Sequence, residues 1–235
     1  MCYISGVKVS HSELLDDALL LVEQNFYFLH VGEFFGALSK KEDFTKRDLN
    51  IKKSFGESQE YSFNPDIIKV LLNDASQNKE EDITLFEYFV EFSAFRSICM
   101  AMVEALRLES KFREFMQIRL GEQFEDFFDI VSFVRNVLSH NIHAQIMLNE
   151  KDYAGTLKRI RRNQRDTNID FTFLYARDLP EIGSPDINYG FTCNVDFENL
   201  EEGMPFLDII SHWDLMMLSE LCFNLVTAYR IFKKP

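Results

Sequence analysis

The stretch from 127 to 143, FFDIVSFVRNVLSHNIH, constrains the fold of this chain more than any other. Its apolar residues recur at steps of three and four, the spacing of one face of an α-helix. They are Phe127, Ile130, Val131, Val134, Val137 and Leu138. The opposite side carries Ser132, Arg135, Asn136, Ser139, His140 and His143 at helical spacing. We therefore predict a helix with one buried face and a second face that concentrates an arginine, an amide and two of the chain's five histidines.

Composition places the chain among ordinary globular proteins. It has 235 residues, of which 46% are hydrophobic and 27% charged, and its 24 phenylalanines predict a core packed with rings. The four cysteines are far apart and form no CxxC pair, which is typical of reduced thiols in a cytosolic protein. We see no signal peptide and no apolar run long enough to span a bilayer. The expected location is cytoplasmic, without membrane contact.

The net charge of −13 disfavours nonspecific binding to nucleic acid or to an anionic membrane. An activity on RNA would therefore need a local basic patch. The dense basic cluster consists of Lys158, Arg159, Arg161, Arg162 and Arg165. Such a run is often a solvated, helix-ending charge run, but its position soon after the 127–143 segment would also let it guide an RNA strand. Both interpretations stay open from the sequence.

Helical patterns occupy most of the chain. Local signals help to set the limits of these helices. They are capping boxes, a capping residue followed by a proline in the first turn, and Gly121 as a helix terminator. Helices are expected over about 10–38, 64–72, 84–108, 111–120, 122–148 and 211–232. The phenylalanine stripes on these helices belong to faces that we expect to be buried. The segment at 40–62 is polar, dense in mixed charge and without a sustained period, so we expect a loop there.

Two segments near the C-terminus alternate apolar and polar residues with period two, over 169–175 and 189–197. The sequence between them, RDLPEIGSPDIN, has the prolines and glycine of a long hairpin loop. An isolated hairpin is marginal in water, so its apolar face must pack on the helices or on a second subunit. We predict a mostly α fold, an antiparallel helical bundle with a two-stranded β-hairpin inserted at about 169–197 before the last helix, in a single domain over 1–235.

The polar face of the 127–143 helix carries groups suited to phosphate chemistry. Arg135 has a permanent charge in a planar fork that matches a phosphate, and His140 can give or take a proton near neutral pH. Asn136 and His140 are four residues apart and should be neighbours on the helix. One arginine and one histidine do not make a complete general acid–base pair. A twofold axis beside this helix would bring two of each together in a composite site.

The arrangement Arg135, Asn136 and His140, in a helical bundle, resembles the signature of the HEPN superfamily. That signature is an arginine, usually followed by a polar residue, with a histidine after four to six intervening positions; here four residues intervene. The resemblance covers this short motif and the all-helical setting. The polar segment at 40–62, the hairpin and the strong acidity are not part of the family's core.

Members of the family that carry the motif are typically metal-independent endoribonucleases, which work as dimers and leave cyclic-phosphate ends. The resemblance implies phosphate binding by Arg135, proton transfer by His140 and an orienting role for Asn136. We expect RNA as the substrate, a homodimer through the motif helix, and neither cofactor nor metal. The expected substrate-binding residues are Ser139, His143, Lys158, Arg159, Arg161 and Arg162. Because many such proteins are toxins or antiviral defence factors, an antitoxin or regulator protein is a further possible partner.

Other interpretations compete with the nuclease hypothesis. Arg135 and His140 could belong to a solvated helix face, and the bundle could be a catalytically silent module that binds a protein or nucleotide partner. His140 and His143 could bind a metal from one helix face, but no carboxylate or cysteine follows at ligand spacing. Ser139 lies in no GxSxG elbow, and the chain has no phosphate-binding P-loop.

Overall fold

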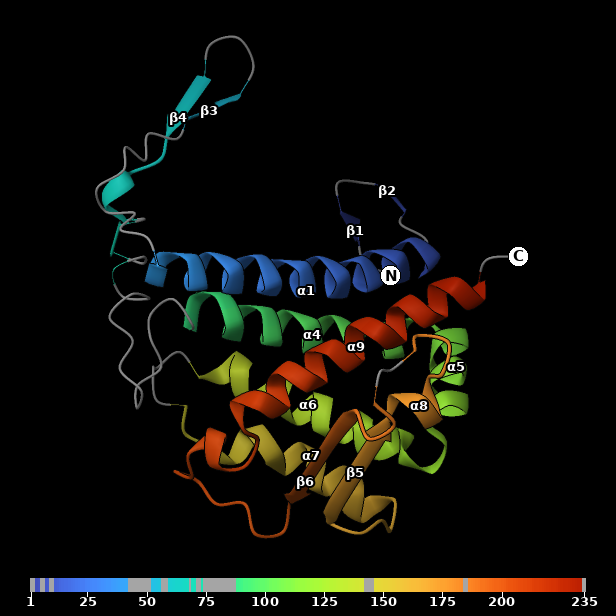
Figure 1. Cartoon of the computed structure of the whole chain (residues 1–235). Helices are drawn as coiled ribbons and strands as arrows, with labels where there is room; N and C mark the ends of the chain where they lie inside the picture. Colours follow the sequence, from blue (N-terminus) through green and yellow to red (C-terminus); the bar gives the residue numbers. More distant parts are fainter. Residues whose placement is uncertain are drawn as a thin grey trace. The chain divides into compact units, whose positions relative to one another are not determined.

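A computed structural model of the chain describes residues 3–4, 7–8, 11–41, 52–55, 59–67, 69–70, 73, 88–141, 146–183 and 186–233. The fold is mostly helical, with a two-stranded antiparallel hairpin before the last helix, as the sequence predicts (Figure 1). Contacts divide the chain into two compact units, one formed by residues 28–93 and the other by 1–27 with 94–235. The organisation of 1–235 as a single domain stays a prediction.

The larger unit is built mainly of helices. They are the first half of α1 (His11–Lys41), α4 (Ser93–Leu108), α5 (Ser110–Leu120), α6 (Phe124–His140), α7 (Glu150–Arg162), the short α8 (Tyr175–Asp178) and α9 (His212–Lys233). Figure 1 shows α6 between α4 and α7. This central place explains why α6 buries residues on nearly every side, including the polar Asp129 and Ser132. Short 3-10 turns at Gly121–Gln123 and Phe206–Asp208 connect these elements, and Tyr3–Ile4 pairs with Val7–Lys8 as a minimal hairpin.

Local signals set the ends of several helices. Gly121, with φ of 55° and ψ of −129°, ends α5 at a positive φ that glycine adopts without steric cost. At the start of α9, the N–H of Asp214 donates to Ser211 Oγ (3.2 Å) and the N–H of Ser211 donates to Asp214 Oδ2 (3.0 Å). This reciprocal capping satisfies backbone donors that the first helical turn leaves free.

The central helix ends earlier than the sequence analysis predicts. α6 stops at His140, and Asn141 is extended (φ −103°, ψ 123°), whereas the expected helix continues to 148. The last carbonyls of a helix have no N–H partner within it. At the end of α6 the Asn141 side chain supplies one, because its Nδ2 donates to the Val137 carbonyl at 2.8 Å. A new helix, α7, then begins after Asn149, so the basic cluster lies on a separate element.

The predicted hairpin is confirmed. Strand β5 (Asn168–Leu174) pairs with β6 (Gly190–Asp196) in antiparallel register, with Phe171 opposite Cys193. Its apolar face packs on helices of the same chain: β6 contacts α9, and the Phe171 ring lies 5.9 Å from that of Phe127 in α6. Gly190 is required where it stands, because a Cβ there would lie 1.9 Å from the Phe173 carbonyl oxygen.

The last helix corrects one expectation. By length and composition alone, His212–Phe232 within α9 could cross a membrane. However, 56% of its most apolar window is buried inside the fold, and the Phe223 ring in it stacks on Phe26 of α1 at 4.5 Å. Core helices of soluble proteins pass the same test, so α9 is consistent with a soluble protein.

The smaller unit, residues 28–93, also differs from the expectation at two places. The segment 40–62, expected as a loop, contains the antiparallel strands β3 (Lys52–Phe55) and β4 (Gln59–Ser62). The expected helix from 84 begins, in the described residues, as a π-helical turn at Tyr88–Phe92 that leads into α4; its expected cap, Thr84 with Glu87, lies outside them. The predicted helix start at Asn64 is present, since its Oδ1 accepts the N–H of Asp66 at 2.9 Å.

A buried carboxylate joins α7 to α6. The Asp129 side chain is fully buried, and Arg159 Nε donates to its Oδ1 at 2.7 Å while Arg165 Nη1 donates to its Oδ2 at 2.5 Å. Arg165 also pairs with Asp126, and the Arg159 guanidinium lies 4.6 Å from the centre of the Phe128 ring. A buried charge needs such partners, because desolvation without them is costly.

We expect Asp129→Asn to lower the free energy of unfolding by about 3 kcal/mol, because it removes the buried counter-charge of Arg159 and leaves Arg165 with Asp126 alone. Urea unfolding followed by circular dichroism measures this. The control is Glu198→Gln, which removes an exposed partner of Arg161 and should cost less than about 1 kcal/mol. Equal effects of the two variants would show that the buried pair does not hold the helices together.

Stability should also fall at high pH. Burial raises the pKa of the Cys99 and Cys193 thiols to about 12, and that of Cys222 well above its usual value. In the unfolded chain these thiols lose their protons from about pH 8.5, while the folded protein keeps them, so the free energy of unfolding decreases as the pH rises from about 9 toward 12. The loss is on the order of 2 kcal/mol per thiol by about pH 10.5. Urea midpoints at about pH 8 and pH 10.5 should show a smaller decrease for Cys193→Ala; an equal decrease would contradict the assignment.

Candidate functional site

The structure brings the three motif residues to the junction between the end of α6 and the first turn of α7. Arg135 Nη1 donates to Asn136 Oδ1 at 2.7 Å, and Asn136 Nδ2 donates to the backbone carbonyl of Asp152 at 3.2 Å. His140 Nδ1 lies 2.7 Å from Asp152 Oδ1. Asn136 and His140 lie four residues apart on α6, as the sequence predicts, and Asp152 is a common neighbour of both: its backbone carbonyl meets Asn136 and its carboxylate meets His140.

The contact between His140 and Asp152 determines how the imidazole can act. Asp152 is fully buried, and 38% of the His140 side chain is exposed. A carboxylate only accepts hydrogen bonds, so a neutral His140 ring must carry its proton on Nδ1 to make this contact. The lone pair is then on Nε2, the ring nitrogen that is left to exchange protons with a ligand. This is the arrangement of an orienting carboxylate behind a general base.

Asp152 is itself held by the start of α7. It is the third residue of a capping box in which its Oδ2 accepts the backbone N–H of Asn149 at 2.8 Å. Asn141 Nδ2 lies 3.4 Å from the same oxygen, and Asn149 Nδ2 lies 3.4 Å from Asn141 Oδ1. The carboxylate thus has partners on both oxygens, so His140 meets a group whose position is set by the helix terminus.

The structure describes the side chains of Arg135 and Ser139 but not that of His143. Arg135 is half-buried, and among the described residues its guanidinium donates to Asn136, which leaves further guanidinium donors for a ligand. Ser139 is exposed next to His140. His143 lies outside the described residues, so the expectation that it binds substrate stays a prediction.

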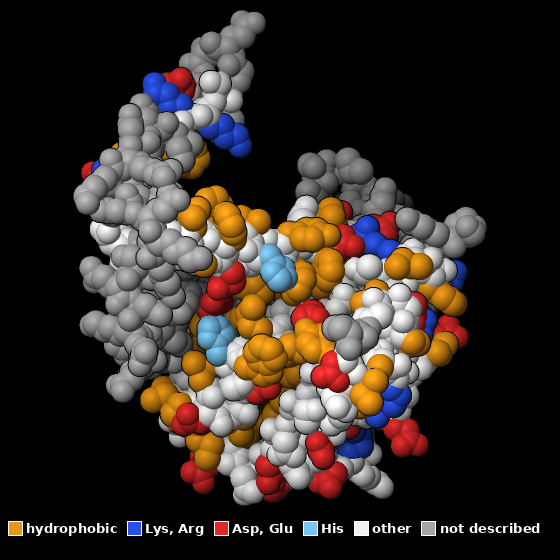
Figure 2. Space-filling view, in the orientation of Figure 1, with side chains coloured by type: hydrophobic (Ala, Val, Ile, Leu, Met, Phe, Trp, Pro, Cys, Tyr) orange, Lys and Arg blue, Asp and Glu red, His pale blue; other side chains and the backbone are white. Residues whose placement is uncertain are grey.

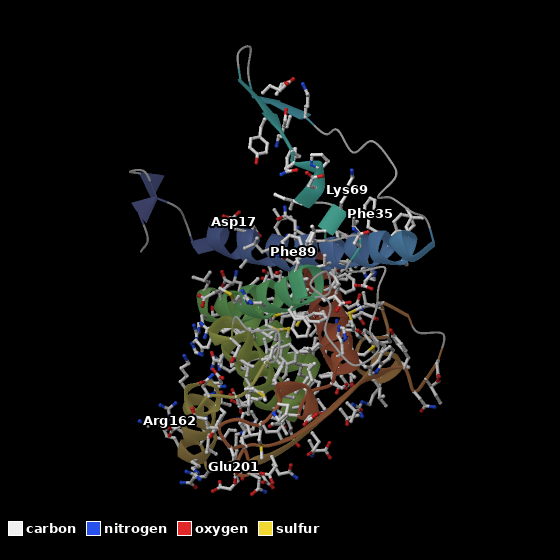
Figure 3. The ribbon with its side chains drawn as sticks, turned by 90° about the vertical axis from the view of Figure 1, so that its left-hand side faces the viewer. Asp17, Phe35, Lys69, Phe89, Arg162 and Glu201 are labelled. Carbon is white, nitrogen blue, oxygen red and sulfur yellow. The ribbon has the colours of Figure 1, made fainter. Side chains whose placement is uncertain are left out.

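The basic cluster does not form one surface with the motif. Arg159 is directed into the buried pair with Asp129, and Arg161 pairs with Glu198 at 2.5 Å. Lys158 and Arg162 are exposed, and Arg162 projects outward from α7 (Figure 3). Of the four basic residues expected to bind substrate, Arg159 is thus committed to holding α7 on α6.

Helix geometry shows why Lys158 and Arg161 lie away from the motif. Asp152, Thr156 and Ile160 are the buried residues of α7, and at about 100° per residue Arg161 is about 180° from Asp152 and Lys158 about 120°. Lys158 and Arg161 instead line a pocket of about 490 Å³ with Tyr153 and Glu202. Burial raises the pKa of Tyr153, and the nearby carboxylates, first that of Glu150, raise it further. The acidic neighbours make this pocket a poor site for an anion.

Sequence reasoning missed Asp152, although a signal for it was present. The pattern Asn149-x-x-Asp152 is a capping box, and it marks a helix start just beyond 148, where the expected central helix ends. This capping box predicts a new helix after Asn149, so the expected single helix divides into α6 and α7. The contact of Asp152 with His140, 12 residues earlier, depends on the chain reversing between the two helices, which no local pattern specifies.

We expect the neutral ring of His140 to carry its proton on Nδ1, which long-range ¹H–¹⁵N NMR correlations of the imidazole would show. Asp152→Asn should weaken this preference, because an amide can either donate to or accept from the ring. Asn149→Ala is the matched control: it removes the capping partner but leaves the carboxylate, so the tautomer should be retained. A wild-type ring protonated mainly on Nε2 would contradict the proposed role of Asp152.

Among the described residues, no group of three or more His, Cys, Asp or Glu side chains is arranged to hold a metal ion. Comparison with models of protein families, with curated proteins and with solved structures gives no match for this chain.

Proposed function

We propose that this chain is a metal-independent endoribonuclease of the HEPN type that acts as a homodimer in the cytoplasm. One observation carries the proposal: a buried carboxylate, Asp152, holds the imidazole of His140 at the junction where Arg135 and Asn136 also lie. This supports a proton-transfer group and a phosphate-binding group at one place. The buried, free thiols Cys99, Cys193 and Cys222 support a reducing compartment.

The proposed reaction is transesterification within the RNA chain. His140 Nε2 takes the proton of a ribose 2′-hydroxyl, and the 2′-oxygen forms a bond to the adjacent phosphorus as the bond from phosphorus to the 5′-oxygen breaks. The leaving 5′-oxygen receives a proton, so the products are a 2′,3′-cyclic phosphate and a 5′-hydroxyl. Arg135 binds the non-bridging phosphate oxygens and stabilises the charge that builds on them.

A second copy of the chain would supply what one subunit lacks. In one subunit, the imidazole that accepts the 2′-proton would also have to protonate the leaving 5′-oxygen, which lies on the other side of the phosphorus. In a homodimer through the motif helix, the two His140 side chains can act as base and acid. Asn136 sits between Arg135 and the backbone at Asp152, so it can set the direction of the guanidinium. Exposed Ser139 can donate to the substrate.

Such a nuclease would need control in its host, because cleavage of cellular RNA is harmful. We therefore propose a role as a toxin or anti-phage defence factor, with an antitoxin or regulator protein as partner. An inhibitor could act simply by covering the exposed edge of His140.

A second candidate is a catalytically silent module that binds a protein or nucleotide partner. Specific observations favour it: the net charge is −13, and Arg159 and Arg165 are committed to Asp129. Few cations of the described residues near the motif are then free to attract an RNA strand.

The test is cleavage of single-stranded RNA in the presence of EDTA. We expect cyclic-phosphate products, and we expect His140→Ala to lower the rate by about a hundredfold or more, because general acid–base catalysis contributes that much. Arg135→Lys should also be slow, since an ammonium cannot form the paired contacts of a guanidinium. Asp152→Asn should lower the rate at unchanged RNA affinity.

The control is Arg107→Ala, which removes a half-exposed arginine of α4 that pairs with Glu104 and should leave the rate unchanged. Circular dichroism confirms that each variant is folded. If chelator abolishes cleavage, or if cleavage survives both His140→Ala and Arg135→Lys, the nuclease proposal is wrong. A folded wild-type protein that cuts no RNA favours the silent module.

A further inference from the structure

Helix α1 has apolar side chains on two opposite sides, and polar residues such as Glu23, His30 and Glu33 lie between them. One side is buried through Ala18, Leu19, Val22, Phe26 and Leu29. The other side exposes seven large apolar side chains, which we name the α1 stripe: Leu20 (41% exposed), Leu21 (48%), Tyr27 (58%), Phe28 (40%), Val31 (53%), Phe34 (63%) and Phe35 (49%). The sequence analysis expected Phe35 to lie on a buried face. A contiguous exposed apolar patch of this kind usually marks an interaction site, so the exposure needs an explanation.

The stripe follows the spacing of paired helices. Leu20, Tyr27 and Phe34 are seven residues apart, and so are Leu21, Phe28 and Phe35, with Val31 between the rows. A seven-residue repeat keeps one seam facing a second helix over several turns. Hydrophobic side chains are visible along α1 in Figure 2, and Figure 3 shows Phe35 on the C-terminal part of the helix.

Charge selects the kind of partner. Between residues 18 and 38 the only charged side chains are Glu23 and Glu33, and both are half-buried; Glu23 pairs with Arg230 at 3.2 Å. The exposed positions of this stretch carry no Asp, Glu, Lys or Arg, in a chain whose net charge is −13. A twofold axis places a surface against itself, so most acidic faces of this protein would repel their copies. The α1 stripe would not.

The same facts disfavour a membrane. Helices that lie in a bilayer surface carry Lys and Arg on a polar face, and their binding gains from anionic lipid. Here the polar positions between residues 18 and 38 include Glu23 and Glu33 but no Lys or Arg, and the acidic chain is repelled by anionic headgroups. A partner of opposite charge is also disfavoured, because the stripe offers nothing charged to recognise.

The exposed area is sufficient for a stable pair. At about 200 Å² for a fully exposed large side chain, the seven exposed fractions amount to about 700 Å² per subunit. Two copies would then bury up to about 1,400 Å², within the range of specific, stable interfaces. The single patch also exceeds the size that monomers usually leave open.

We propose that the α1 stripe is a homodimer interface, in which α1 of one subunit packs along α1 of a second copy about a twofold axis. The contact is isologous and apolar, with the aromatic rows of the two helices interdigitating. It does not rest on the proposed nuclease activity, and it is distinct from a dimer through the motif helix, since α1 and α6 are different elements.

The test is the mass of the full chain by light scattering and sedimentation over a range of concentrations. We expect twice the 27.6 kDa of one chain for the wild type. Val31→Glu and Phe34→Glu should each give a folded monomer, because they place a charge on an exposed apolar face. The matched control is Ile118→Glu, at a 74% exposed apolar position of α5, which should remain dimeric.

A wild type that is monomeric at all concentrations overturns the proposal, as does a dimer that survives both Val31→Glu and Phe34→Glu. A dimer that is broken by Ser139→Glu but not by these variants would run through the motif helix instead, which also overturns it. Binding of the wild-type monomer to neutral lipid vesicles would identify a membrane as the occupant.

Discussion

The buried carboxylate of Asp129 anchors the candidate site. It takes two arginines, one from α7 and one from the turn after it, and so ties α7 along α6. The position of α7 decides where its first turn lies, and that turn carries Asp152. The geometry around His140 therefore depends on an ion pair at the opposite end of α7.

The two buried aspartates have different chemical settings. Asp129 meets permanent cations, so its charge is compensated inside the protein and nothing is left to react. Asp152 meets neutral amide donors and an imidazole that is partly exposed. The first setting stabilises a fold, whereas the second orients a group that can change its protonation state in contact with solvent. Similar side chains thus serve packing at one end of α7 and, in the proposed function, proton transfer at the other.

The surfaces outside the core are also unlike one another. The chain as a whole is acidic, the arginines of α7 are largely paired, and the α1 stripe is uncharged. A pairing of α1 helices does not by itself bring two His140 side chains together, because the motif is on α6. If both contacts form, each chain takes part in two different twofold interfaces, and the assembly becomes larger than a dimer.

Local sequence patterns were enough to predict most of the helices, the β5–β6 hairpin and the placement of Arg135, Asn136 and His140 on one helix. These features follow from periodicity and capping, which act between residues a few positions apart. The resemblance to HEPN proteins stays a prediction.

Other features became known only from the folded chain: α6 ends at His140, Asp152 meets its ring, Asp129 takes up Arg159, and Phe34 and Phe35 remain exposed. Each of these depends on which distant side chain supplies a counter-charge or covers an apolar face. Such pairings are set by how the chain folds back on itself, and a local pattern does not contain that information.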